Sequence, residues 1–157
     1  MVADYFLKID GIPGESKDPR HSGEIELDSF SWGESHLAHA GATNAARPAI
    51  HDFHVVKHTD KASPLLMLAA ASGEHFKSAV LTAQRPGEEP QDYLTITLGD
   101  LMVSSYQIEA PDAQTWPVDR VALSFARIEM TYRPRRPDGT VDAPVTAGWD
   151  VTAHHKI

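Results

Sequence analysis

The chain has 157 residues, a length at which one domain buries roughly two-thirds of its unfolded surface, and we expect a single domain over residues 1–157. Its 14 lysines and arginines against 22 aspartates and glutamates give a formal charge of −8, which argues against binding to nucleic acid phosphates. The absence of cysteine excludes disulfide bonds, a thiolate nucleophile and Cys-ligated zinc.

The sequence contains no apolar stretch near the ~20 residues that a membrane-spanning helix needs, and its longest apolar run is Leu65–Ala71. The first 14 residues include Asp4 and Asp10 and lack a cationic start followed by an apolar centre. We therefore expect neither membrane insertion nor a Sec signal peptide, so that export would need a route that reads no such signal.

The N-terminal part alternates with period two, which predicts strands. Tyr5–Ile9 forms the first, and Gly11–Gly14 predicts the turn after it. A second strand is predicted over Glu24–Trp32, where the buried parity changes between Leu27 and Phe30. Such a phase change is typical of a β-bulge, because one extra residue reverses which side chains face inward.

The middle of the chain predicts a loop, a strand and a helix in that order. Residues 37–48 are mostly small, so we expect an extended loop, and Ile50–His58 is rich in β-branched and aromatic residues typical of a strand. Ser63 before a proline predicts a helix N-cap. The helix Pro64–Ser72 should end at Gly73, which favours a left-handed cap.

The C-terminal half predicts further strands. Gly99-Asp100 predicts a tight hairpin between two of them, and a second parity change between Phe125 and Ile128 predicts a bulge or a bend in the longest. These strands are Lys77–Gln84, Tyr93–Leu98, Leu101–Glu109 and Arg120–Arg133, with a short closing segment at Gly148–Thr152. Seven or eight strands with one short helix indicate a mainly β protein, an antiparallel barrel or sandwich.

The outward faces of two strands are small and hydroxylated. Leu94, Ile96 and Leu98 should face the core, which turns the two threonines between them outward. Ser29 and Ser31 point away from the core side of their strand in the same manner. A nearly uncharged face of this kind favours contact with another protein surface or a shared cavity over open solvent.

Candidate catalytic and metal-binding patterns are weak. On a strand, His54 and His58 share a face but lie ~13 Å apart at ~3.3 Å per residue, and His51 points to the other side, so we expect no metal site. Gly14–Lys17 and Gly33–His36 lack the closing glycine of a nucleophile elbow. We expect neither an enzyme nor a bound cofactor.

Charge is distributed unevenly along the chain. Arg133–Pro137 is the main basic run, whereas residues 1–37 hold eight acidic and three cationic side chains, a net charge of −5. One interpretation is a solvated strand end; the other is a head-to-tail contact between copies, which builds rings or filaments.

Several blocks of the sequence carry a family resemblance. The blocks are Asp4–Asp18, Ser29–Gly33, Asp60–Ala69, Ser72–His75, Tyr93–Leu98, Val103–Tyr106, Val121–Phe125 and Gly148–Asp150. In this order they resemble the haemolysin-coregulated proteins (Hcp), the tube proteins of bacterial type VI secretion. The resemblance implies a two-sheet antiparallel β-barrel with one short helix, assembling into a hexameric ring.

The resemblance also implies function and partners. Rings would stack into an inner tube that carries or chaperones effector proteins in its lumen, is tipped by a VgrG spike protein and is expelled by sheath proteins. The protein would assemble in the bacterial cytoplasm and then be secreted without a signal peptide. The alternative is a monomeric hydrolase or small-ligand binding module on a similar barrel, which would need a single deep pocket with convergent polar groups.

Site residues follow from the same resemblance. Ser31, with Ser29 beside it, matches the strand that lines the lumen, where effectors bind. The extended loop matches the family segment that contacts neighbouring subunits or rings. Its candidate interface residues are His39, Ala40, Gly41, Ala42, Thr43, Asn44 and Ala45.

Overall fold

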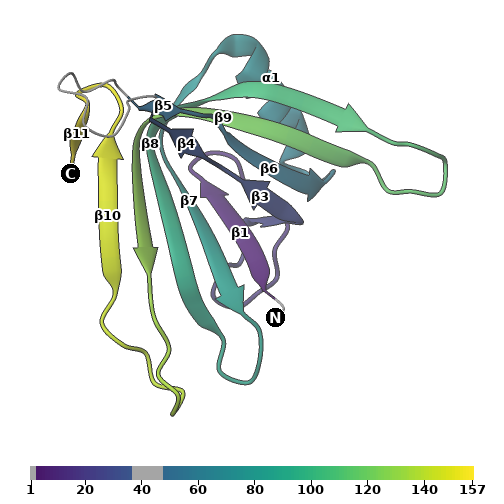
Figure 1. The fold of residues 1–157 in the computed structure, drawn as a ribbon. Coiled ribbons are helices and arrows are strands. Elements are labelled where there is room, and N and C mark those ends of the chain that lie inside the picture. The colour runs from purple at the N-terminus through teal and green to yellow at the C-terminus, as the bar shows by residue number, and fades with distance from the viewer. Residues whose placement is uncertain (1–2, 37–47) are drawn as a thin grey trace.

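The computed structural model describes residues 3–36 and 48–157, which form antiparallel strands and one helix (Figure 1). The helix is α1 (Ser63–Ser72). The strands are β1 (Asp4–Ile9), β2 (Ile25–Leu27), β3 (Ser29–Ser31), β4 (Glu34–Ser35), β5 (Ala49–Ile50), β6 (Phe53–His58), β7 (His75–Arg85), β8 (Gln91–Glu109), β9 (Val118–Tyr132), β10 (Val145–Asp150) and β11 (His155–Lys156).

Two sheets share the long strands β8 and β9. One follows the order β11-β10-β9-β8-β7-β1-β2, and the other is formed where β6 pairs with the first half of β9 and β3 pairs with β6. All these pairings are antiparallel. Figure 1 shows the end of β8 and the start of β9 joined in a hairpin that projects from the body. The expected two-sheet antiparallel barrel with one helix is confirmed.

The first parity change arises from a change of partner strand. β2 pairs with β1, and β3 pairs with β6. Between them the N–H of Asp28 donates to the Val56 carbonyl at 2.8 Å. The chain thus passes from one sheet to the other at Asp28, which closes the barrel and reverses the buried parity.

The hairpin predicted at Gly99-Asp100 is wrong. β8 runs unbroken through these residues and keeps one register with β9, with Leu98 opposite Ile128 and Leu101 opposite Phe125. Asp100 has φ 49°, a left-handed conformation that aspartate tolerates better than most residues. β9 remains the partner of β8 both before and after Gly99-Asp100. The glycine and the left-handed aspartate therefore produce a local irregularity within one long strand and not a turn between two.

The second parity change, predicted as a bulge or bend in the longest strand, also reflects a change of partner. β9 pairs with β6 up to Leu123 and with β10 from Arg127 onward. The register irregularity lies in the facing strand, between Val103 and Ser105 of β8. The first half of β9 therefore turns one of its faces toward the core, and the second half turns the opposite face toward it.

The hydrophobic core fills the space between the sheets and beneath α1. Ile96 and Leu98 are each 2% exposed, and Leu94 packs against the same cluster, as the alternation predicts. Burying a side chain of this size contributes about 1.5–3 kcal/mol. The other fully buried apolar side chains include Leu7, Ile25, Phe53, Leu66, Leu81, Leu101, Val103 and Leu123.

The helix occupies the predicted segment, but its N-cap differs. Ala62 stands at the cap without a side-chain hydrogen bond, and Ser63 is already helical. The Ser63 hydroxyl instead donates to the Asp119 carboxylate. Gly73 caps the other end with φ 68°, as expected. No helix among the described residues is long and apolar enough to cross a bilayer.

Candidate functional site

The sheet formed by β3, β6, β9 and the end of β8 has a polar outer face. Ser29 and Ser31 are exposed on β3, whereas Phe30 between them packs on the core. Ser31 pairs with His54 of β6, and cross-strand partners lie on the same face of a sheet. The structure thus places both predicted serines outside the core, beside an exposed histidine.

Register extends this face across two further strands. His54 pairs with Ala122 of β9, and Ala122 pairs with Ser105 of β8. Two residues along β9 on the same face, Arg120 pairs with Gln107. The face carries hydroxyl, amide and imidazole groups and little apolar bulk. We call it the polar face; its exposed members are Ser29, Ser31, His54, His58, Ser105, Gln107, Glu109 and Arg120.

Charges on and around the polar face are paired. His58 Nδ1 lies 2.8 Å from an Asp28 carboxylate oxygen, and Arg120 lies 3.8 Å from Glu109. All four side chains are substantially exposed, and exposed pairs contribute little to stability. The polar face therefore offers distributed hydrogen-bonding groups and no concentrated charge.

A buried ionic cluster lies behind this face, on the core side of the same strands. Lys57 and Asp119 are cross-strand partners with no exposed surface, and Lys57 Nζ lies 2.9 Å from the Asp119 carboxylate. Lys57 Nζ also lies 2.8 Å from Asp60 and donates to the Ser63 hydroxyl at 3.0 Å. The cluster joins β6, β9 and the first turn of α1.

The hydrogen bonds of this cluster keep Asp119 ionised. Burial alone raises the pKa of the Asp119 carboxyl, but hydrogen bonds from Ser63, Lys57 and Thr59 outweigh it and leave the pKa below its usual value. Burial also raises the pKa of the nearby Tyr106 phenol, with a contribution from its hydrogen bond to Asp119. Because Ser63 already donates to a carboxylate and is only 3% exposed, it is no accessible nucleophile.

Two of the three histidines singled out in the sequence lie as the strand geometry predicts, because His54 and His58 are on the polar face four residues apart. His51 lies between β5 and β6 and not inside a strand, and its carbonyl accepts from Trp32 Nε1 at 2.8 Å. Among residues 3–36 and 48–157, no three His, Asp or Glu side chains converge as metal ligands would. The candidate interface residues 39–45 lie outside the described residues.

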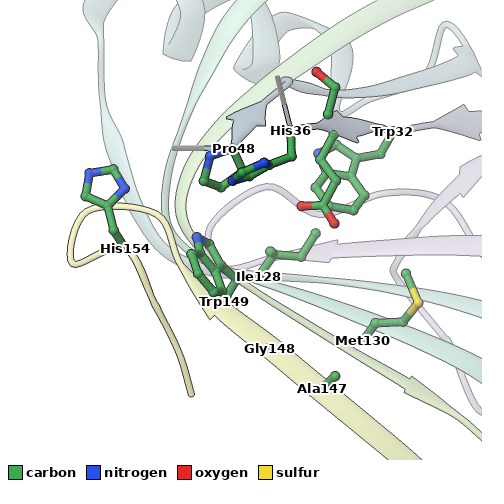
Figure 2. Close-up of a pocket in the computed structure, with 11 residues that line it drawn as sticks. Trp32, His36, Pro48, Ile128, Met130, Ala147, Gly148, Trp149 and His154 are labelled. Carbon is green, nitrogen blue, oxygen red and sulfur yellow. The ribbon is translucent and has the colours of Figure 1, made fainter. Parts of the chain in front are cut away.

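The structure adds a cleft that the sequence did not predict. It has a volume of about 900 Å³ and opens between β10, the end of β9 and the β4–β5 pair. Figure 2 shows the Trp32 and Trp149 rings on two sides of it with Ile128 between them. Met130 and Ala147 extend its apolar floor, and Glu34, Ser35, His36, Pro48, Gly148 and His154 complete its lining. The alternation in the sequence showed that one side of β9 is apolar. It could not show that some of these apolar side chains are left exposed by the rest of the fold.

A second feature missed at the sequence level is a clamp around His21. This side chain is 6% exposed, stacks on Phe6 at 4.5 Å between ring centroids, and contacts Glu24 and Asp92, each at 3.0 Å. It fastens the β1–β2 connection to β8. The sequence around His21 could not predict this contact, because Asp92 is 71 residues away in the chain.

Comparison with known proteins agrees with this architecture. The sequence pattern of the family described as "Type VI secretion system effector, Hcp" matches residues 6–132. Protein hcp1 of Pseudomonas aeruginosa is 36% identical over 156 residues, 96% of each chain. The crystal structure of Hcp1 from Salmonella typhimurium is 33% identical with a TM-score of 0.83 over the whole of both chains. A structure described as that of a type six secretion system protein has a TM-score of 0.93 at 23% identity, covering 99% of this chain and 100% of the other, a likeness of fold.

Proposed function

The chain belongs to the Hcp family of type VI secretion, and from that premise we propose that it is a structural subunit of the secretion tube. Six copies close into a ring, and rings stack into the inner tube that is expelled. Effector proteins are carried or chaperoned in the lumen. The observation that carries the cargo role is the polar face, a broad surface on one sheet of the barrel.

The chemistry of the polar face suits transient contact with another protein. Ser29 and Ser31 offer small hydroxyl groups, which donate and accept hydrogen bonds without a net charge. Its charged members are exposed and paired. We assign this face to the lumen, with Ser31 and Ser29 in contact with effectors, because such a surface can hold cargo weakly enough to release it.

The polar face does not favour the alternative of a hydrolase or small-ligand module. Such a site needs convergent polar groups in a deep pocket, whereas these side chains are spread over four strands. The cleft is concave, but its floor is apolar. We therefore propose a non-enzymatic subunit, formed by one domain over residues 1–157 and without a cofactor.

The remaining partners follow from the place of a tube in the secretion machine. We propose that the tube is capped by a VgrG spike protein and surrounded by sheath proteins. The subunit assembles in the bacterial cytoplasm and leaves by type VI secretion without a signal peptide. Residues 39–45 supply contacts between subunits or rings.

The test combines imaging of the purified protein with a variant of the polar face. Ser31→Arg should leave annular hexamers intact in electron micrographs while weakening retention of a co-expressed effector by about 10-fold, the change that ~1.4 kcal/mol produces. Ser22→Arg is the matched control, because Ser22 is exposed in the β1–β2 connection and lies on none of the strands that form this face. Unchanged retention in both variants would remove Ser31 from the cargo contact, and a strictly monomeric protein would refute the tube role.

A further inference from the structure

The polar face and its borders carry more carboxylates than permanent cations. Arg120 on the face lies 3.8 Å from Glu109, which balances its charge. Asp28, 43% exposed, precedes β3 at one border. Asp52 precedes β6 at another border, where it accepts a hydrogen bond from the exposed Ser104 hydroxyl at 2.7 Å. While its histidines are neutral, this surface therefore has a net charge of −2 per copy.

Asp52 lies on the outer side of its sheet together with two histidines. Phe53 is 0% exposed and faces the core, and neighbouring residues of an extended chain face opposite sides. His54 and His58 are exposed and lie at even spacing from Asp52, so they share its side. One strand and the residue before it thus bring a carboxylate and two titratable imidazoles to the same surface.

Each histidine changes the charge of the polar face in its own way. His58 Nδ1 lies 2.8 and 3.0 Å from the two carboxylate oxygens of Asp28, so protonation of this imidazole makes the pair neutral. His54 lies on an interior strand of the face, between Ser31 and Ala122. Its protonation therefore adds a positive charge among groups that have none.

The charges packed around the two histidines do not supply an excess of positive charge. Arg120 pairs with Val56, the residue midway between the histidines, but its charge is already balanced by a glutamate. Behind the sheet, Lys57 is in contact with both Asp60 and Asp119. This buried cluster has one more carboxylate than cations, so it adds to the negative potential of the face.

The border toward β7 has the same character. Its exposed charged groups are Glu74 and Lys77, at the start of β7, and Asp100 on β8. His75 Nδ1 lies 3.3 Å from the Asp100 carboxylate. While His75 is neutral, this border also holds no excess of positive charge.

Protonation of the two histidines abolishes the net charge of the surface. Histidine is the side chain that ordinarily changes its charge between pH 8 and pH 5. With both imidazoles protonated, the net charge rises from −2 to zero per copy. In a ring, copies of the face surround one lumen, and walls of one sign focus the electric field in an enclosed space. The surface thus attracts cations while its histidines are neutral and loses this attraction when they are protonated.

We propose that the polar face holds cargo through basic side chains of the cargo, and that protonation of His54 and His58 releases it. This role rests on the tube-subunit function, because the face encloses cargo only when copies form a ring. The cargo surface is cationic because the charges left unbalanced on the face are carboxylates. The histidines make the attraction depend on pH within the range that leaves those carboxylates ionised.

Peptide binding to purified rings tests both parts of the proposal. The probe is a short fluorescent peptide of alternating lysine and serine, and the matched peptide has glutamate in place of lysine. Fluorescence anisotropy at low salt gives the dissociation constant at pH 8 and at pH 5.5. Two added charges about 8 Å from a bound cation in water change its affinity about 5-fold. The lysine peptide should therefore bind about 5-fold more weakly at pH 5.5, and at pH 8 it should bind more tightly than the glutamate peptide.

Replacement of the histidines separates the polar face from the rest of the surface. In the double variant H54Q/H58Q most of the pH dependence should vanish, because glutamine is uncharged at both values of pH. H154N/H155Q is the matched control and should keep the change of about 5-fold, because both residues are exposed and lie outside the strands of the face. Asparagine replaces His154 because this residue has φ 57°, a left-handed conformation that asparagine tolerates.

A permanent charge at the same position gives an independent test. His54→Lys should weaken binding of the lysine peptide about 2-fold at pH 8, the effect of one added charge about 8 Å from the bound cation. Circular dichroism and electron microscopy should show the same fold and the same rings for every variant, because the replaced side chains are exposed. Unchanged binding to the His54→Lys rings would exclude an electrostatic role of this position.

The remaining outcomes distinguish the charge effect from the tube function. An equal change with pH in H54Q/H58Q and in the unmodified protein would show that other groups control binding, and would overturn the role of these histidines. Tighter binding of the glutamate peptide at pH 8 would refute a basic cargo. Rings that bind neither peptide would also refute it and leave the tube function standing. Absence of rings in the unmodified protein would instead refute the function on which the cargo role rests.

Discussion

The side chains that fix the two sheets to the helix are polar as well as apolar. Lys57 and Asp119 form an ion pair with no exposure to solvent, and such a pair stabilises only if both partners remain. Ser63 and Thr59 satisfy further acceptor positions of the carboxylate. The pair and its hydrogen-bond partners therefore link β6, β9 and α1. They also explain why the serine at the start of the helix does not cap it, since its hydroxyl donates to the carboxylate.

Lys57→Met should destabilise the protein by about 3–5 kcal/mol, because it leaves the Asp119 charge buried without its cation. The free energy of unfolding in urea measures the effect. The double variant K57M/D119L should lose less than the sum of the two single losses, since contacting residues are not additive. Lys77→Met is the control, because Lys77 is exposed on β7, and it should change stability by no more than about 0.5 kcal/mol.

His21 should make the stability of the protein depend on pH. Burial lowers the pKa of this imidazole, but the hydrogen bonds to Asp92 and Glu24 together with their charges outweigh burial and leave the pKa above 6.5. A group whose pKa is raised on folding contributes stability that is complete below its unfolded pKa and is lost as pH rises through its folded pKa. The stabilisation from His21 should therefore be larger at pH 6 than at pH 8.

His21→Gln tests this directly by thermal or urea unfolding at both values of pH. The loss of stability relative to the unmodified protein should be greater at pH 6, where the imidazolium bridges two carboxylates. His75→Gln serves as control, because His75 is 66% exposed and contacts an exposed Asp100. A loss for His21→Gln that is equal at both values of pH would mean that His21 contributes by packing on Phe6 alone.

At the scale of elements, the connections decide which strands can meet. The β1–β2 connection is held by backbone bonds, with Gly14 N–H donating to the Gly23 carbonyl at 2.8 Å and Ser16 N–H donating to the Glu24 carbonyl at 3.0 Å. This pairing brings Gly14 so close to the chain at Glu24 that a Cβ would collide with its carbonyl oxygen. A glycine is required there by close approach of two backbones.

Gly14→Ala and Gly33→Ala form a matched pair of substitutions. At Gly14 the methyl group meets backbone that cannot move aside cheaply, so the loss should be about 1–3 kcal/mol, as for overpacking. At Gly33 a Cβ meets nothing within 4 Å, and the change should stay within about 0.5 kcal/mol. Melting temperatures of the two variants measure the contrast, and similar temperatures would contradict the assigned role of Gly14.

At the scale of the whole molecule, the two sheets have different outer surfaces. One presents the polar face, and the barrel leaves an apolar cleft open at the edge formed by β9 and β10. Uncovered apolar surface of this kind marks interaction sites. Because we propose that copies of this chain form a ring and a tube, we interpret both surfaces by their positions in that assembly.

Deletion of Thr43-Asn44-Ala45 should weaken association between subunits or rings, while the barrel still folds. The segment lies in the proposed interface loop, and shortening a loop alters closure entropy only slightly, so the effect should fall on assembly. Native mass spectrometry measures the distribution of oligomers, and circular dichroism checks the fold. A distribution identical to that of the unmodified protein would exclude a role of these three residues in assembly.

The sequence by itself determined the helix, most of the strand segments and the family. Alternation located the buried residues of β8, the Ser-Pro and Gly73 signals bounded α1, and the ordered sequence blocks identified the Hcp resemblance. These features are local, because side-chain direction and capping depend on residues within a few positions of each other. The position of Ser31 outside the core followed from the same local alternation.

Only the tertiary structure decided which strands meet. The parity changes predicted as bulges proved to be changes of partner at Asp28 and within β9, and Gly99-Asp100 lay inside a strand that looked like two. The cleft, the Lys57–Asp119 pair and the His21–Asp92 contact join residues far apart in the chain. Strand pairing brings these groups together, and one strand's pattern of apolar residues does not specify which neighbour covers it.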